Sequence, residues 1–221
     1  MTWVKVCGMT NVEDALAAAE AGADAVGFVF YEKSPRCVTV ETARQIASRL
    51  PERVDRIGVF VNHKPQTVSD IADQAGLTAV QFHGDEYQSP QEYSVNRSAF
   101  FCLPAMEAVS RFRADGAWLK TDDFPNLAGI MLDSGSAENR GGTGKIFAWE
   151  EARSFVSALG PAHRVVVAGG LNSSNVALAL EVLKPWGVDV VSGVEARPGK
   201  KDPEKVRAFV RAVREADRKG S

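Results

Sequence analysis

The sequence predicts an α/β protein: one domain over residues 1–221, folded as a closed (β/α)8 barrel with eight parallel strands. Short apolar runs rich in β-branched or aromatic residues recur eight times along the chain. They begin about 20 to 36 residues apart, roughly the size of a strand plus a crossover helix, and no linker interrupts them. Eight such units can close with right-handed crossovers and leave no sheet edge. An open doubly wound sheet is the alternative.

The predicted strands begin at or near Trp3, Asp24, Val54, Thr78, Ala99, Ala128, Arg164 and Val188. Between most of them, apolar residues recur with the 3.6-residue period of a helix. The pattern is least regular from residue 89 to residue 123. The helices after the fourth and fifth strands are therefore the least well defined by the sequence.

Capping residues predict where several helices begin and end. Candidate N-cap residues precede four helical stretches, and they are Asn11, Thr39 or Val40, Gln66 or Thr67, and Asn172. Three glycines stand where a helix would end in left-handed geometry, and they are Gly22, Gly76 and Gly160.

Composition and charge point to a folded chain with a small-molecule partner. Of the 221 residues, 45% are hydrophobic and 24% are charged, which provides a core and argues against disorder. The formal charge is 26 − 28 = −2, so no basic field exists to hold nucleic acid or an anionic membrane. Either a monomer or a homodimer is compatible with these features.

Cysteine usage predicts a reducing compartment. Cys7, Cys37 and Cys102 form no C-x-x-C pair and leave an odd number, which argues against a disulfide framework or a zinc ribbon. The first residues do not resemble a signal peptide, and no apolar run reaches 18 residues. We therefore expect a cytoplasmic protein.

The first predicted strand carries a candidate catalytic base. Side chains alternate along a strand, so Lys5 and Cys7 share one face, which we expect to point into the barrel. Barrel enzymes carry their reactive groups at the carboxyl ends of the strands. An ammonium beside the thiol would favour the thiolate, which makes Cys7 a candidate base. The alternative is that Cys7 serves as a small buried hydrophobe.

The sixth predicted strand carries a candidate catalytic acid. Its apolar run ends in Asp133, where a carboxyl group has no packing role. A carboxyl at the end of a barrel strand could donate a proton to a ligand. A turn or a helix cap is the alternative role for Asp133.

Glycine-rich turns after the last three strands predict a phosphate site. They are residues 141–144, 169–170 and 192–193. Each is weak evidence alone, but together they would let backbone N–H groups approach one phosphate. We therefore expect a small phosphorylated ligand.

One arginine and one histidine are candidates for further roles. Arg36 follows Pro35 in the loop after the second strand, where its guanidinium could bind a second anion such as a carboxylate or could remain a solvated charge. His83 and Asp85 lie close together in the sequence, but no H-x-x-x-H or H-E-x-x-H spacing is present. The sequence therefore predicts no metal and no other cofactor.

A set of motifs in a fixed order resembles one enzyme family. They are KVCG at 5–8, SPR at 34–36, GVFV at 58–61, QFHG at 81–84, LDS at 132–134, GGTGK at 141–145, AGGL at 168–171 and DVVSGVE with PGKKD between 189 and 202. In this order they resemble the phosphoribosylanthranilate isomerases of tryptophan biosynthesis. The resemblance runs from Lys5 to about Phe209.

The resemblance implies a cofactor-free Amadori rearrangement with Cys7 as general base and Asp133 as general acid. It also implies that Arg36 binds the anthranilate carboxylate and that Asp189 contacts the sugar or orders the loop. The residues implied to surround the phosphate are Gly142, Thr143, Gly144, Gly169, Gly170, Ser192 and Gly193.

Three positions depart from the family pattern: Phe82 replaces a common leucine, Val191 a common serine and Ala148 a common aspartate. The change at Ala148 predicts a helix without a side-chain N-cap, which costs about 1 kcal/mol. Two other functions remain open: the histidine-pathway isomerase of the same fold and a non-catalytic phosphate-binding barrel. The former resembles this chain at the phosphate loops but uses an aspartate where this chain has Cys7.

Overall fold

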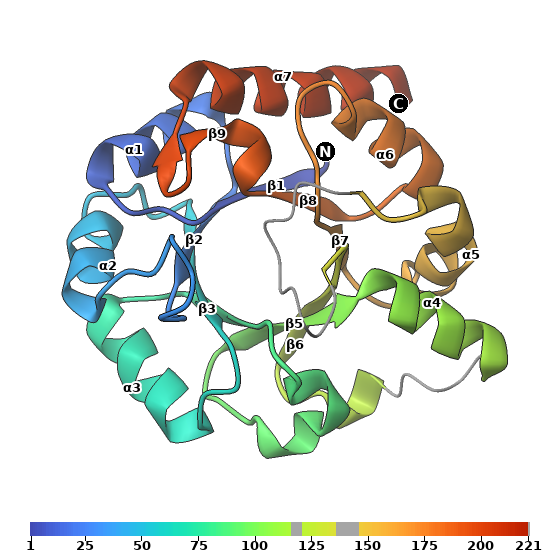
Figure 1. Cartoon of the computed structure of the whole chain (residues 1–221), viewed down its shortest axis with the longest axis horizontal. Coiled ribbons are helices and arrows are strands. Elements are labelled where there is room, and N and C mark those ends of the chain that lie inside the picture. Colours follow the sequence, from blue (N-terminus) through green and yellow to red (C-terminus); the bar gives the residue numbers. More distant parts are fainter. Residues whose placement is uncertain (116–120, 136–145, 221) are drawn as a thin grey trace.

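The predicted barrel is confirmed. The computed structural model describes residues 1–115, 121–135 and 146–220, and within them eight strands form one closed parallel sheet. The strands are β1 (Trp3–Cys7), β2 (Ala25–Val29), β3 (Asp55–Phe60), β4 (Ala79–Phe82), β5 (Ser98–Pro104), β6 (Leu127–Asp133), β7 (Val165–Val167) and β8 (Gly187–Val190). Pairing between β1 and β8 closes the ring seen in Figure 1 and excludes the open sheet. This is a TIM-barrel topology.

The α-helices lie outside the ring of strands (Figure 1). They are α1 (Val12–Ala21), α2 (Val40–Ala47), α3 (Pro65–Ala75), α4 (Ala105–Ala114), α5 (Trp149–Leu159), α6 (Val176–Leu183) and α7 (Pro203–Gly220). The predicted N-caps Asn11 and Thr39 are confirmed, because each side chain accepts a backbone N–H of the first turn. Ala148 precedes α5 without a side-chain cap, as predicted.

Several predicted helix ends are wrong. The helix α3 begins at Pro65, before Gln66, because proline is suited to the first helical position. The helix α6 begins at Val176, because the Asn172 side chain closes a tight turn with the backbone of Ser174. Gly22 and Gly76 are left-handed as predicted, whereas Gly160 has φ −53°.

The helix expected after the fourth strand is replaced by two short 3-10 helices, η1 (Glu86–Gln88) and η2 (Pro90–Glu92). The buried Glu86 carboxylate accepts hydrogen bonds from the backbone N–H groups of Asn62 and Gly84. Pro90 then prevents a longer helix from continuing through this segment. The helix after the fifth strand does form, as α4.

Two apolar layers position the carboxyl ends of the strands. One lies between the strands and the helices, and the smaller one fills the barrel around Ile57, Phe100 and Met131. Trp3 stacks on Phe100 and Trp186, with ring centroids 5.6 and 5.1 Å away. Because Trp3 begins β1, this aromatic stack lies at the end of the barrel opposite the carboxyl ends.

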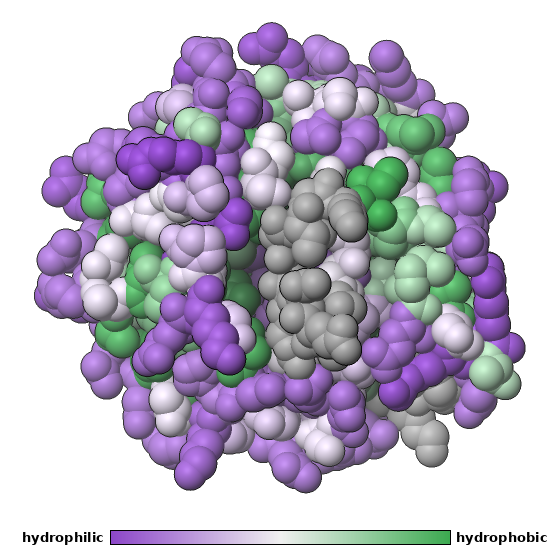
Figure 2. All heavy atoms as spheres, in the orientation of Figure 1, coloured by the Kyte–Doolittle hydropathy of each residue, from purple (hydrophilic) through white to green (hydrophobic). Residues whose placement is uncertain are grey.

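The last helix is tied to the segment that precedes β1. In α7 the Asp217 carboxylate accepts hydrogen bonds from the backbone N–H and the hydroxyl of Thr2. Figure 2 shows hydrophilic residues over most of the outer rim of the molecule. No helix among the described residues is long and apolar enough to cross a membrane.

Candidate active site

One pocket at the carboxyl ends of the strands contains both predicted catalytic residues. Cys7 ends β1 and Asp133 ends β6, and the two side chains line this pocket together with Arg36 and Asp189. Both are nearly buried, with 4% of Cys7 and 7% of Asp133 exposed. The barrel therefore brings together a thiol and a carboxyl that are 126 positions apart in the sequence (133 − 7).

Beneath Cys7, a buried ion pair links β1 to β8. Lys5 and Asp189 are register partners, and the Lys5 Nζ lies 3.0 Å from the Asp189 Oδ1. Burial by itself would lower the pKa of Lys5, but the charges of Asp189 and Cys7 raise it above its ordinary value. Lys5 therefore remains an ammonium inside the barrel, as its position on the first strand predicted.

The prediction that Lys5 favours the Cys7 thiolate is only partly confirmed. Lys5 does lower the pKa of Cys7, but burial has the larger effect and raises the pKa above that of an ordinary thiol. Asp189 also raises it. Cys7 is therefore a protonated thiol at neutral pH, and its thiolate would be a stronger base than an ordinary one.

This difference predicts how Cys7 reacts with a small alkylating reagent. Only the thiolate is nucleophilic, so the rate should rise with pH and reach half its maximum at a higher pH than in an unstructured cysteine peptide. Mass spectrometry of the peptide that contains Cys7 measures this rate separately from that of the exposed Cys37. A midpoint below that of the free peptide would contradict the effect of burial.

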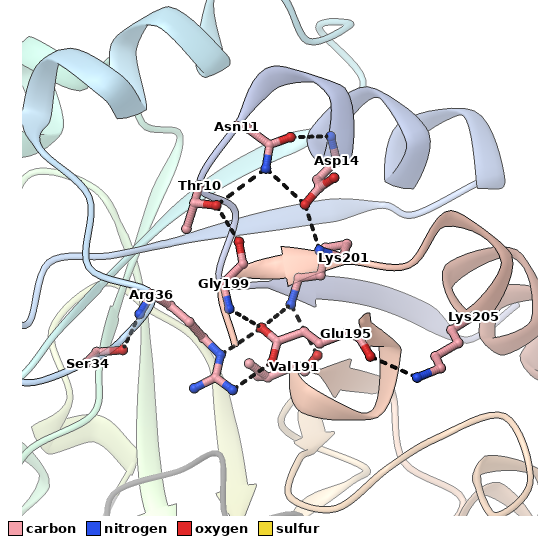
Figure 3. Close-up of polar contacts among 10 residues, drawn as sticks. All are labelled: Thr10, Asn11, Asp14, Ser34, Arg36, Val191, Glu195, Gly199, Lys201 and Lys205. Atoms are coloured by element: carbon pink, nitrogen blue, oxygen red, sulfur yellow. Dashed lines mark hydrogen bonds and ion pairs between the residues drawn. The ribbon is translucent and has the colours of Figure 1, made fainter. Parts of the chain in front are cut away.

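Arg36 reaches the pocket from the loop after β2 and is held there by Glu195 (Figure 3). Its Nε lies 2.8 Å from the Glu195 Oε1, and its Nη2 lies 2.7 Å from Oε2. A guanidinium has five N–H donors, so this two-bond contact leaves others for a ligand. Gly8, at φ +81°, lets the Arg36 stem pass, because a Cβ there would approach the Arg36 Cδ to 2.8 Å.

Glu195 lies in β9 (Glu195–Arg197), which forms a hairpin with β10 (Lys200–Lys201). The Lys201 Nζ lies 3.2 Å from the Glu195 Oε1 and also donates to the carbonyl oxygen of Val191. Burial opposes ionisation of Glu195, but its bonds with Arg36 and Lys201 lower its pKa below the ordinary value. The carboxylate is therefore charged and fixes Arg36.

The sequence did not identify this network. Two consecutive lysines such as Lys200 and Lys201 ordinarily lie on a solvated surface. The hairpin instead folds Lys201 against Glu195 and leaves it only 2% exposed. Lys200 is partly exposed and pairs with Asp14 in α1. The Pro198-Gly199 pair could have indicated a turn at this point of the sequence. Such a turn can bring a following lysine close to Glu195.

The predicted phosphate residues fall on loops that contact each other. Gly169 and Gly170 follow β7 with positive φ, and Ser192 and Gly193 lie in the 3-10 helix after β8. A Cβ on Gly193 would overlap the carbonyl oxygen of Leu171, so the loops after β7 and β8 touch. Residues 142–144 lie outside the described residues.

A closed barrel whose pocket holds a thiol, a carboxyl and an anchored arginine at the carboxyl ends of the strands has the arrangement of a TIM-barrel enzyme, with groups that could transfer protons and bind an anion. The family model for N-(5'-phosphoribosyl)anthranilate isomerase matches residues 4–212. The chain therefore belongs to the N-(5'-phosphoribosyl)anthranilate isomerase family.

Individual members of this family are similar to this protein over nearly the whole chain. The enzyme of this name from Rubrobacter xylanophilus is 47% identical over 97% of this chain and 100% of its own length. The crystal structure of the phosphoribosyl anthranilate isomerase of Thermotoga maritima superposes with a TM-score of 0.84 at 39% identity, covering 97% of this chain and 100% of that one. A structure in complex with reduced 1-(o-carboxyphenylamino)-1-deoxyribulose 5-phosphate has a TM-score of 0.79 at 37% identity, with the same coverage.

Proposed function

We propose that this protein converts N-(5'-phosphoribosyl)anthranilate into 1-(2-carboxyphenylamino)-1-deoxyribulose 5-phosphate. The observation that carries the proposal is the placement of Cys7 and Asp133 in one pocket of a chain that belongs to this family. The solved relative with a reduced form of this product supports the choice of substrate. The free cysteines support a reducing, cytoplasmic location.

The reaction requires one acid and one base. In the proposed mechanism Asp133 protonates the furanose ring oxygen, the bond from that oxygen to C1' breaks, and the ring opens to a Schiff base. Cys7 then removes the proton from C2', which gives an enolamine that tautomerises to the ketone. A raised pKa makes the Cys7 thiolate a stronger base but leaves less of it at neutral pH, so turnover should rise with pH as Cys7 loses its proton.

Binding is assigned to charged and backbone groups around this pair. We propose that Arg36, fixed by Glu195, binds the anthranilate carboxylate. Asp189, 4% exposed beside the pocket and paired with Lys5, is assigned to the sugar or to the order of the adjacent loop. The phosphate is assigned to Gly142, Thr143, Gly144, Gly169, Gly170, Ser192 and Gly193.

Turnover of the substrate tests the proposal directly. The purified protein should remove the fluorescence of phosphoribosylanthranilate without releasing anthranilate, and the product should have the same mass as the substrate. Released anthranilate would indicate hydrolysis. A fluorescence that stays constant would identify a binding barrel without catalysis.

Replacing Arg36 by methionine should weaken binding of the reduced product analogue about 10- to 100-fold, since a charge-assisted hydrogen bond contributes roughly 1.5–3 kcal/mol. Binding of ribose 5-phosphate, which lacks the aromatic carboxylate, should hardly change. Isothermal titration of both ligands makes the comparison. Equal weakening of the two would place Arg36 on the phosphate instead.

The Glu195→Gln variant should also weaken binding of the reduced product analogue, but less than Arg36→Met does. The amide keeps the size of the side chain but no longer holds the Arg36 guanidinium in place. A matched control is Glu41→Gln, which breaks a similar two-bond contact with Arg44 on the exposed surface of α2. That control should leave ligand binding unchanged.

Inorganic phosphate should raise the melting temperature by binding the native state, with about 2.7 kcal/mol of stabilisation at 100 times its dissociation constant. Gly193→Ala should abolish this protection, because the added methyl group forces the two contacting loops apart. Gly220→Ala is the matched control, since its Cβ would meet no atom within 4 Å. Unchanged protection in Gly193→Ala would place the phosphate elsewhere.

A further inference from the structure

Three potential metal ligands converge beside the pocket, and of these only Asp133 has a role assigned above. His83 directly follows β4, Cys102 lies in β5 and Asp133 ends β6. One ligand atom from each lies within 4.8 Å of the other two. The residues are 19 and 31 positions apart in the sequence, so no motif spacing reveals them.

The separation of the two softer ligands fits a tetrahedral ion. The Cys102 Sγ lies 3.8 Å from the His83 Nε2. Zinc–sulfur and zinc–nitrogen bonds of about 2.3 and 2.1 Å at a tetrahedral angle place the two ligand atoms about 3.6 Å apart. Cys102 and Asp133 lie on adjacent paired strands, and His83 follows the strand on the other side of β5, so only side chains need to adjust.

Gln81 offers the support that a metal-bound histidine requires. Its Nε2 lies 2.9 Å from the His83 Nδ1, while its buried Oε1 has no hydrogen-bond partner within residues 1–115, 121–135 and 146–220. A metal at Nε2 leaves the ring proton on Nδ1, which then needs an acceptor. If the Gln81 amide group rotates so that its oxygen and nitrogen exchange places, Oε1 faces the His83 Nδ1 and can accept its proton.

The local charge also favours a cation. Asp133 supplies one carboxylate to the cluster, and the Asp189 carboxylate lines the same pocket. A divalent ion would offset those carboxylates and displace the thiol proton, as coordination to a metal does. His83 and Asp133 line the pocket, which gives the ion a way in.

We propose that His83, Cys102 and Asp133 form an inhibitory site for a thiophilic divalent cation of the zinc class. An imidazole, a thiolate and a carboxylate are a donor set that zinc accepts, with a fourth position for water. Occupation of the site takes the Asp133 carboxylate away from proton transfer. The inhibitory part rests on the proposed function, whereas the binding part does not.

Cobalt(II) as a spectroscopic probe tests the binding part on the whole chain. One equivalent should give a thiolate-to-cobalt charge-transfer band that zinc abolishes. Cys102→Ala should remove the band, and His83→Gln should keep the thiolate but weaken cobalt binding at least tenfold. Cys37→Ala and Cys7→Ala should retain the band. Loss of the band in Cys7→Ala with retention in Cys102→Ala, or no band in a wild-type protein whose circular dichroism shows it folded, would overturn the inference.

Turnover assays test the inhibitory part. Zinc should inhibit wild-type turnover, a chelator should restore it, and the ratio of rates with and without zinc should approach one in Cys102→Ala. Without zinc, exhaustive chelation should leave wild-type activity intact, because the proposed mechanism uses no metal. A cobalt band without any turnover would contradict the proposed function and leave the site standing. Turnover with undiminished zinc sensitivity in Cys102→Ala would contradict the site alone.

Discussion

Replacing Cys7 by serine is expected to lower kcat by a factor of about 10²–10⁴ or more, because general bases usually contribute that much. This factor corresponds to an increase of about 2.7–5.5 kcal/mol in the activation free energy. Serine occupies nearly the same volume at the end of β1, so the barrel should still fold. Its hydroxyl does not ionise usefully near neutral pH, so the loss falls at the upper end of this range or beyond. Single-turnover kinetics on the variant measures the effect.

The matched control for this substitution is Cys37→Ser. Cys37 is an exposed free cysteine, so the same chemical change there should leave kcat unaffected. The reduced product analogue should bind Cys7→Ser within about tenfold of wild type, because the assigned phosphate and carboxylate contacts remain. A Cys7→Ser enzyme with near-normal turnover would remove Cys7 from the role of base.

Asp133→Asn should lower kcat by a similar factor of about 10²–10⁴, because an amide cannot protonate the ring oxygen. The Asp133 Oδ1 accepts the backbone N–H of Gly135 at 2.6 Å, and the asparagine oxygen can keep this bond. The loss should therefore appear in kcat more than in affinity for the product analogue. Rapid-mixing measurements of ring opening would place the defect in the first chemical step.

The control for the acid is Asp122→Asn, which makes the same change at an exposed position in the 3-10 helix Thr121–Asp123. It should retain full turnover. If Asp133→Asn weakened analogue binding as strongly as it lowered kcat, Asp133 would be a binding residue. The double variant Cys7→Ser/Asp133→Asn should lose less than the product of the two single losses, because the acid and the base act in one mechanism.

Local sequence patterns were sufficient to predict the barrel and the positions where its strands begin. Each predicted strand start lies within about one residue of the observed one, because alternating apolar runs and capping residues act over a few positions. The pattern failed after β4, where the buried Glu86 and Pro90 replace a helix by two 3-10 helices. A contact from Glu86 back to Asn62 belongs to the tertiary structure and leaves no periodicity to detect.

For the candidate site, the sequence by itself determined that Cys7 and Asp133 stand at the ends of strands that face one cavity, because strand alternation and barrel closure follow from local periodicity. Only the tertiary structure decided their environment. Burial raises the pKa of Cys7 despite Lys5, Glu195 fixes Arg36 from 159 residues away, and Lys201 is buried rather than solvated. These properties depend on groups that meet only when the barrel closes, and desolvation and ion pairing act through space rather than along the chain.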